Sequence, residues 1–322
     1  MLYVNVLTMA LRWEAVRFGG PREALELVKV DMPPPRTGEV IVDVRAVGMN
    51  PADYKHIAGG QNPKLLPLSL GFEVSGVISA VGRDTQIASG GGNADDEVIA
   101  AQISGGYATQ VRVKASDVFA KPATLPFPDA AGLILAGSTA SELVHMTGVR
   151  AGDTVLIHGA SGAVGISAVQ QARLLGARVI GTAGESGREM VRRYGGELVA
   201  YGTGLEERVR ALAPDGVTAA IDTVGTAEAI DVSLALVSDR GRIATTAAFD
   251  RAQKEGFRLV GARNPASGPF RARIRPQLIQ LASEGSLQVP VGRTFPFAQA
   301  PDALALLMGP HPEGKLALIV DP

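Results

Sequence analysis

Three regularly spaced glycines, Gly159, Gly162 and Gly165, come directly after a short run of β-forming apolar residues. A stretch with apolar residues at helical spacing follows, and a second β-like run over residues 178–182 completes a βαβ pattern. In such a pattern the first glycine permits a tight turn, the second lets the backbone approach a pyrophosphate, and the third lets the helix lie close to the sheet. The helix N-terminus also offers unpaired N–H groups to phosphates. The sequence therefore predicts a dinucleotide site at this loop, with contacts from Gly159, Ser161, Gly162, Ala163, Val164 and Gly165.

Composition excludes several functional classes. The 322 residues carry a net charge of −1, which gives no general attraction to nucleic acid or to an anionic membrane. No apolar run approaches the length of a bilayer span, and no signal peptide is recognisable. Cysteine is absent, which removes disulfides, thiolate nucleophiles and cysteine-based metal sites. We therefore expect a cytoplasmic protein that binds neither nucleic acid nor membranes.

The chain alternates between two styles of sequence. Residues 12–121 are short β-like runs broken by Gly and Pro, which predicts an antiparallel, barrel-like β domain. Residues 126–284 alternate strands with amphipathic helices, which predicts an α/β fold with a doubly wound parallel sheet. The strands of this sheet are expected near residues 155–158, 178–182, 197–201, 218–223, 241–246 and 257–262. After Gly285 the β style returns, so the end of the chain is expected to rejoin the first domain. The predicted domains are residues 1–125 with 286–322, and residues 126–285. Segments 61–68 and 249–256 are expected to be loops that shape a substrate pocket.

Further motifs occur in one order along nearly the whole chain, at residues 47–54, 70–76, 105–108, 135–140, 292–297 and 314–318. With the glycine loop, they resemble the medium-chain dehydrogenase/reductase superfamily, and within it the zinc-free quinone oxidoreductase branch of the zeta-crystallin type. The resemblance implies a GroES-like β-barrel substrate domain interrupted by a Rossmann domain. It also implies use of NADPH and a homodimer. The last sheet strand, near residues 257–262, is the expected dimer edge, since an unprotected apolar edge invites pairing.

The chain departs from the zinc enzymes of this superfamily at two ligand positions. Asn50 stands where those enzymes have a cysteine, and Phe72 stands where they have a histidine. Neither residue completes a tetrahedral N/S zinc site. The four histidines are scattered along the sequence, and we interpret each as structural or surface: His56, His145, His158 and His311. The sequence therefore predicts a protein without a metal site.

The end of the second strand bears on the choice of nicotinamide. An NAD-specific site has an acidic residue there, whereas this chain has Ala183 and Gly184, with Arg188 shortly after. Arg188, and Tyr201 at the end of the third strand, suit the 2′-phosphate of NADPH. Glu185 is a competing ligand, because its carboxylate favours the ribose hydroxyls of NAD. The alternative interpretation is that Glu185 and Arg188 are solvated charges at the start of a helix.

The resemblance also implies roles for Thr139, Val224, Asn50 and Tyr54. Thr139 is expected close to the nicotinamide, and its alternative role is that of a helix N-cap. Val224 is expected beside the cofactor. Asn50 and Tyr54 are predicted to hydrogen-bond a substrate carbonyl, with Tyr54 or water as the proton source. Their alternative roles are a turn Asn before a proline and a packed Tyr.

These observations predict an NADPH-dependent oxidoreductase that reduces a quinone or an activated alkene such as an α,β-unsaturated carbonyl. The cofactor supplies the hydride, and the protein supplies orientation and polarisation. The alternative is a non-catalytic protein that binds NADPH for a structural or regulatory purpose.

Overall fold

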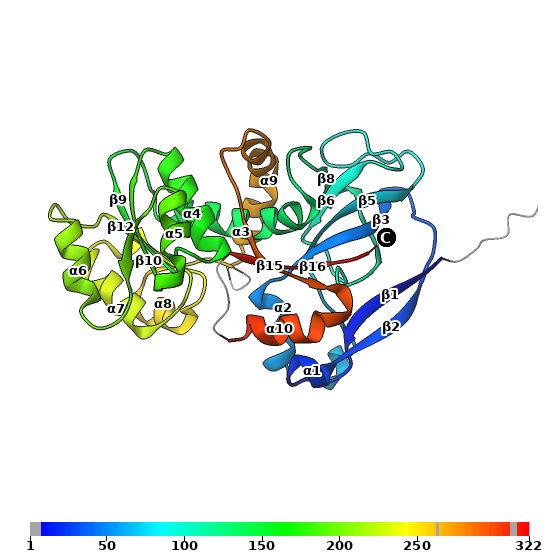
Figure 1. Cartoon of the computed structure of the whole chain (residues 1–322), viewed down its shortest axis with the longest axis horizontal. Helices are drawn as coiled ribbons and strands as arrows, with labels where there is room; N and C mark the ends of the chain where they lie inside the picture. Colours follow the sequence, from blue (N-terminus) through cyan, green and yellow to red (C-terminus); the bar gives the residue numbers. More distant parts are fainter. Residues whose placement is uncertain (1–7, 262–263, 310–313, 322) are drawn as a thin grey trace, which may run out of the picture. The chain divides into compact units, whose positions relative to one another are not determined.

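The computed structural model describes residues 8–261, 264–309 and 314–321 of the chain. It divides into two compact units, which Figure 1 shows by sequence colour. Unit 1 comprises Met1–Leu135 and Pro290–Pro322, and unit 2 comprises Ala136–Val289. The boundaries expected from sequence, 125/126 and 285/286, lie ten and four residues before those of the units. The larger difference arises because α3, Phe127–Met146, is one continuous helix that passes from unit 1 into unit 2.

Unit 1 contains two sheets. The smaller has the strand order β2-β1-β4, with bounds Leu25–Met32, Thr8–Ala15 and Leu68–Ser69. The larger has the order β15-β16-β3-β5-β6-β8, and β7 pairs with β3. Its strands are β3 (Glu39–Gly48), β5 (Glu73–Val81), β6 (Glu97–Ala101), β7 (Gln110–Lys114), β8 (Val118–Ala120), β15 (Val291–Pro296) and β16 (Lys315–Ile319). All pairs are antiparallel except β15 with β16. The GroES-like β domain is confirmed, with one parallel pair at its C-terminal end.

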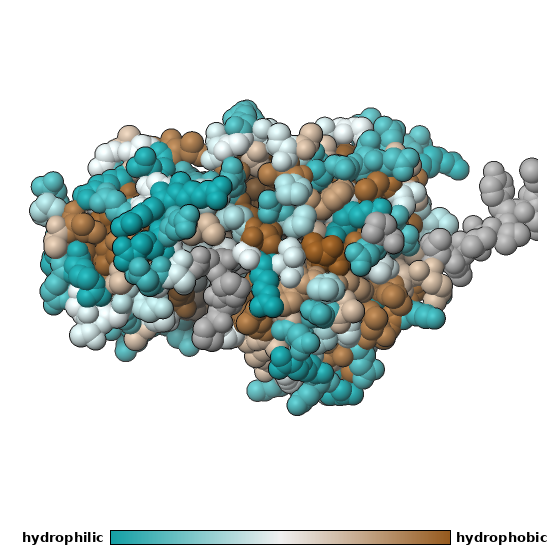
Figure 2. Space-filling model, in the orientation of Figure 1, coloured by the Kyte–Doolittle hydropathy of each residue, from teal (hydrophilic) through white to brown (hydrophobic). Residues whose placement is uncertain are grey.

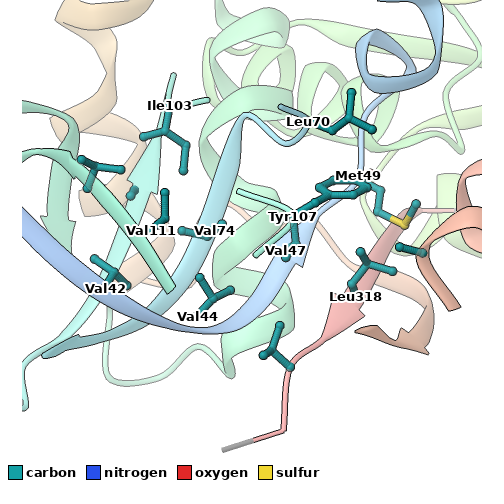
Figure 3. Packing of buried hydrophobic residues seen from close by; sticks show 14 of the residues in the cluster. Val42, Val44, Val47, Met49, Leu70, Val74, Ile103, Tyr107, Val111 and Leu318 are labelled. Atoms are coloured by element: carbon teal, nitrogen blue, oxygen red, sulfur yellow. The ribbon is translucent and has the colours of Figure 1, made fainter. Parts of the chain in front are cut away.

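Three α-helices accompany these sheets, α1 (Pro21–Ala24), α2 (Pro51–Ala58) and α10 (Ala300–Leu307). The apolar core of unit 1 is formed mainly by alternate residues of its strands, such as Val40, Val42 and Val44 of β3. Figure 3 shows Val42 and Val44 with Tyr107, whose ring lies beside Met49. Tyr107 is fully buried, so its hydroxyl needs a partner inside the protein.

Unit 2 is built on a parallel six-stranded sheet of order β11-β10-β9-β12-β13-β14. Its strands are β9 (Thr154–His158), β10 (Arg178–Ala183), β11 (Glu197–Ala200), β12 (Ala219–Asp222), β13 (Ile243–Thr245) and β14 (Arg258–Leu259). Its helices, besides the second half of α3, are α4 (Ala163–Leu174), α5 (Arg188–Arg193), α6 (Leu205–Leu212), α7 (Ala227–Leu236), α8 (Phe249–Glu255) and α9 (Ser267–Ser283). The expected Rossmann fold is therefore confirmed, with all six strands close to their predicted positions.

The sheet of unit 2 is covered on both faces. Along β9, Val155 and Ile157 belong to one apolar cluster with residues of α3, α4 and α5, whereas Leu156 belongs to another with residues of α6, α7 and α8. Since side chains alternate across a strand, these clusters are the two faces of the sheet. This explains why the strands of unit 2 read as continuous apolar runs.

Two local expectations differ from the structure. Residues 249–256, expected to be a loop, form helix α8, which ends at Gly256 with a φ of +77°. A glycine in the left-handed region is a normal helix terminator, so the signal was present and was overlooked. The strand expected over residues 257–262 is shorter, since β14 covers Arg258–Leu259 and residue 262 lies outside the described residues.

On the face in Figure 2, hydrophilic side chains cover much of both units, with hydrophobic patches among them. In the described part of the chain, no helix is both long enough and apolar enough to cross a bilayer.

Candidate functional site

The glycine-rich loop of unit 2 joins β9 to α4. Gly159 has a φ of +74°, and a Cβ there would lie 2.6 Å from Thr223 Oγ1 and from Val224 Cγ1. A Cβ on Gly165 would lie 2.1 Å from the Gly159 carbonyl oxygen, so only glycine allows α4 to begin this close to the loop. In contrast, a Cβ on Gly162 would meet only the Gly159 carbonyl oxygen, at 3.5 Å. The loop is therefore tight on its protein side and open at Gly162.

Gly162 is also the N-cap residue of α4, and no side chain in the described ranges caps it. The N–H groups of the first turn are therefore free to bind an anion, and the helix dipole favours negative charge there. The half-buried Ser161, Ala163 and Val164 flank this point. The backbone, rather than charged side chains, thus forms a cradle that fits the pyrophosphate of a dinucleotide.

The turns after β10 and β11 lie next to this cradle. A Cβ on Gly187 would lie 2.6 Å from Ser161 Cβ, so the turn that leads to Arg188 contacts the glycine loop. A Cβ on Gly184 would lie 3.3 Å from the hydroxyl of Tyr201, which is 63% exposed. The sheet order β11-β10-β9 therefore gathers the loop, the Arg188 turn and Tyr201 at one edge.

Arg188, the first residue of α5, forms an exposed ion pair with Glu185, at 2.7 Å between Nη2 and Oε2. The Arg188 guanidinium holds the pKa of the Glu185 carboxyl below its usual value. Sequence analysis treated Arg188 as a ligand for a 2′-phosphate and Glu185 as a competing ligand for ribose hydroxyls. In the structure the two side chains form an ion pair with each other, so their charges cancel.

Val224 lies in the turn after β12, is 48% exposed and borders Gly159. This turn is fixed by Asp222, whose Oδ1 accepts hydrogen bonds from the N–H groups of Val224 at 3.1 Å and Gly225 at 2.9 Å. The other carboxylate oxygen accepts one from the Thr245 hydroxyl at 2.6 Å. Sequence analysis missed Asp222 and Thr245, although a polar residue at the carboxyl end of a buried strand was a usable signal.

Thr139 is buried in the interior of α3, which begins at Phe127. The alternative that Thr139 is a helix N-cap is therefore wrong. The helix begins earlier because Pro128 in the first turn has a φ already suited to a helix.

In unit 1, a polar cluster lies inside the protein where β3, β5, β16 and α3 meet. Lys315 Nζ donates to Asn50 Oδ1 and to Glu73 Oε1, both at 2.6 Å. Asn50 Nδ2 donates to Glu73 Oε1 at 3.0 Å and to the Gly48 carbonyl at 3.1 Å. The other Glu73 oxygen accepts from the backbone N–H of Leu135 at 2.9 Å. Lys315, Glu73 and Asn50 are 3%, 0% and 4% exposed, so this is a buried ion pair with a buried amide attached.

Asp53 extends this polar region. It is fully buried, and its Oδ2 accepts from the Asn50 N–H at 2.7 Å and from the Tyr107 hydroxyl at 3.0 Å. Its Oδ1 has no partner in the described ranges. Burial raises the pKa of Asp53 to about 7, against the opposing effect of its hydrogen bonds. Sequence analysis missed Glu73, Lys315 and Asp53, because a charged residue in a sequence reads as exposed. It missed Tyr107 because its partner Asp53 lies 54 residues away in the sequence.

The two predicted catalytic residues have different environments. The side-chain amide of Asn50 already uses both ends within the cluster, whereas Tyr54 on α2 is half-buried against the core. The Tyr54 hydroxyl forms no hydrogen bond with any described residue, and burial raises its pKa. Tyr54 is therefore a protonated donor without an acceptor in the described part of the chain, whereas both ends of the Asn50 amide are hydrogen-bonded.

No three His, Cys, Asp or Glu side chains within the described ranges are grouped so as to hold a metal ion. Phe72 packs edge-on against His56 at 5.5 Å, and His145 stacks on Phe270 at 4.9 Å. His158 is buried beside Thr182, and burial lowers its pKa to about 4. These three histidines thus make packing contacts, and His311 lies outside the described residues.

Comparison with known proteins places these features in a family. The family described as "Alcohol dehydrogenase GroES-like domain" matches residues 36–123, and that described as "Zinc-binding dehydrogenase" matches residues 163–268. Both models agree with the medium-chain dehydrogenase/reductase superfamily, and its quinone oxidoreductase branch, as the family that this chain resembles. The resemblance inferred from the motifs is therefore confirmed.

Individual relatives agree with this assignment. Quinone oxidoreductase of Sus scrofa is 38% identical over 186 residues, which are 57% of this chain and 56% of that protein. The chain thus spans about half the length of that relative. The structure of the quinone oxidoreductase from Coxiella burnetii has a TM-score of 0.79 at 28% identity and covers 98% of this chain and 100% of its own. The Escherichia coli quinone oxidoreductase complexed with NADPH has a TM-score of 0.82 at 26% identity, covering 96% and 99%.

Proposed function

We propose that this protein is an NADPH-dependent oxidoreductase that reduces a quinone or an activated alkene by hydride transfer, without zinc. The observation that carries the proposal is the glycine cradle of unit 2, which is open at Gly162 and faces the uncapped N-terminus of α4. The quinone oxidoreductase relatives, one of them complexed with NADPH, support the same reaction class.

The residues of unit 2 would hold the cofactor. The α4 N-terminus and Gly162 bind the pyrophosphate, and Arg188 and Tyr201 bind the adenosine end with its 2′-phosphate. Thr139 and Val224 complete the predicted contacts. When bound, NADPH supplies the hydride, so the chain itself needs no redox group.

Unit 1 would supply the polar groups for the substrate. Tyr54 is the better of the two predicted donors, because its hydroxyl has no acceptor among the described residues and burial keeps it protonated. We propose that the Tyr54 hydroxyl donates a hydrogen bond to the substrate carbonyl. After the hydride has been transferred, the same hydroxyl donates a proton to the substrate. The side-chain amide of Asn50 is already hydrogen-bonded to Lys315 and Glu73. We therefore propose that Asn50 helps to position Tyr54 and does not itself bind the substrate. Without a metal to polarise it, the substrate must already be electrophilic.

We further propose a cytoplasmic homodimer that pairs through β14. This strand forms one edge of its sheet, opposite the edge formed by β11, and an unpaired edge is a template for a second copy. Light scattering at micromolar concentration tests it, and a monomer would exclude it.

Stopped-flow spectroscopy tests the reaction. The protein with bound NADPH is mixed with a panel of quinones and α,β-unsaturated ketones, and NADPH absorbance is followed in a single turnover. We expect oxidation by at least one acceptor at a rate that saturates with its concentration, and Tyr54→Phe should slow that step. Tight NADPH binding without oxidation by any acceptor would instead support the non-catalytic alternative.

A further inference from the structure

The pair of Lys315 and Glu73 in unit 1 is buried at a cost in free energy. Removing an ammonium and a carboxylate from water costs several kcal/mol for each ion, and an apolar pair of similar volume often stabilises a protein as well or better. Packing alone therefore gives no reason for two charges at 3% and 0% exposure. Unlike apolar side chains, the two charges can fix the orientation of a neighbouring dipole.

That dipole is the side-chain amide of Asn50. An ammonium only donates hydrogen bonds and a carboxylate only accepts them. Lys315 therefore selects Oδ1 of the amide, at 2.6 Å, and Glu73 selects Nδ2, at 3.0 Å. Rotating the amide by half a turn would place its oxygen against the carboxylate and its N–H groups against the ammonium. The ion pair thus leaves one orientation for Asn50.

Asn50 is the N-cap residue of α2, so fixing it fixes the start of that helix. The same turn is held a second time, because Asp53 Oδ2 accepts from the Asn50 N–H at 2.7 Å and from Tyr107 at 3.0 Å. Tyr54 is the next residue along α2. The position of the Tyr54 ring therefore depends on this first turn, in which Asn50 and Asp53 are both hydrogen-bonded to buried groups.

Two glycines pack closely against the ion pair. A Cβ on Gly48 would lie 2.3 Å from the Ala131 carbonyl oxygen and 2.8 Å from Glu73 Oε1. A Cβ on Gly132 would lie 3.0 Å from Cγ of Lys315. A side chain at either glycine would therefore collide with the ion pair or with the backbone beside it, so both positions need glycine for the pair to lie here.

We propose that Lys315 and Glu73 are positioning residues, which orient Asn50 and the first turn of α2 so that Tyr54 is held in its donor position. The proposal rests on the proposed function, in which Tyr54 is the donor. It assigns the two buried charges a role that needs both of them and that an apolar pair would not perform.

The test is the double variant Lys315→Met/Glu73→Gln, which removes both charges and leaves no charge unpaired. The matched control is Lys121→Met/Glu97→Gln, since Lys121 is a second well-buried lysine of unit 1 paired with a glutamate, at 2.9 Å. We expect kcat for quinone reduction to fall about 10- to 100-fold in the first variant, because small misplacements of a reacting group have effects of this size. The Kd for NADPH should stay within about twofold, and the control should keep the wild-type kcat.

Amide hydrogen exchange supplies a readout that does not depend on activity. Exchange over Asn50–Tyr54 should accelerate at least tenfold in the double variant, while β3 and β5 keep their protection. A folded double variant with wild-type kcat and wild-type exchange would overturn the proposal. If the wild-type protein reduces no acceptor, the proposed function fails and the exchange experiment alone decides the positioning role. If the double variant does not fold, Asn50→Ala is used, and unchanged exchange in α2 of that variant overturns the proposal.

Discussion

The glycine cradle of unit 2 and the polar cluster of unit 1 are built in opposite ways. The cradle is made of backbone groups from residues adjacent in sequence, and its flanking residues are half-buried or exposed. The cluster is made of side chains at positions 50, 53, 73, 107 and 315, and all of them are at most 4% exposed. The first uses uncapped N–H groups and the second uses paired charges. The cradle should therefore tolerate changes at its flanking side chains, though not at Gly159 and Gly165, whereas a charge cluster is sensitive to any single loss.

The largest expected effect tests this sensitivity directly. Lys315→Met leaves Glu73 buried without its cation, so the free energy of unfolding should fall by about 3–5 kcal/mol. Glu197→Gln is the matched control, because Glu197 pairs with Arg178 on the surface and should contribute at most about 1 kcal/mol. Urea unfolding at pH 7 measures both. A loss below about 1 kcal/mol for Lys315→Met would show that the cluster is no more sensitive than the surface.

A second prediction concerns pH. The folded pKa of Asp53 is about 7, above the usual value near 3.8, so the native state holds this proton more tightly than the unfolded state. Its contribution to stability is complete below about pH 4 and is lost as the pH rises through about 7. Asp53→Asn should therefore remove about 2–3 kcal/mol of the decrease in stability between pH 5 and pH 8.

Unfolding curves at the two pH values measure this difference, with the exposed Asp31→Asn as control. If wild type and Asp53→Asn lose the same stability between these values, Asp53 does not titrate there.

The third prediction concerns Arg188, in the turn beside the cradle. Arg188→Ala should remove a charge-assisted bond to the 2′-phosphate, which weakens NADPH binding about 10- to 100-fold. The affinity for NADH, which lacks the 2′-phosphate, should hardly change. Fluorescence titration with both nucleotides measures the two Kd values. A wild-type protein that already prefers NADH would mean that Glu185 binds the ribose and that the assignment of Arg188 is wrong.

The smallest expected effect is none at all. Exhaustive chelation should leave the activity unchanged, because Asn50 is held by Lys315 and Glu73 and Phe72 packs on His56. Metal analysis of the purified protein accompanies the activity measurement. Stoichiometric zinc whose removal abolishes activity would contradict the zinc-free interpretation.

Sequence analysis found most of the cradle in unit 2 and missed most of the polar cluster in unit 1. Gly159, Gly162 and Gly165 were readable because each glycine acts locally, through its own turn or its own missing Cβ. Arg188 and Tyr201 were readable because each follows a strand of a parallel sheet, whose carboxyl ends meet at one edge. Glu73 and Lys315 were not, since their partnership spans 242 residues and nothing local marks either as buried. Helix α2 was also missed, although its start carries local signals, with Asn50 as the N-cap residue, Pro51 in the first turn and Asp53 three residues after the cap.

The Glu73–Lys315 pair also restricts how this protein can evolve. Losing either charge alone leaves the other buried and destabilises the fold, whereas replacing both at once is close to neutral for stability. Any stepwise replacement of the charged pair by an apolar pair therefore passes through a strongly destabilised single mutant. Drift at the two positions should be rare and, when it happens, simultaneous. Among descendants of this sequence, positions 73 and 315 should behave as a single inherited character, although they lie 242 residues apart.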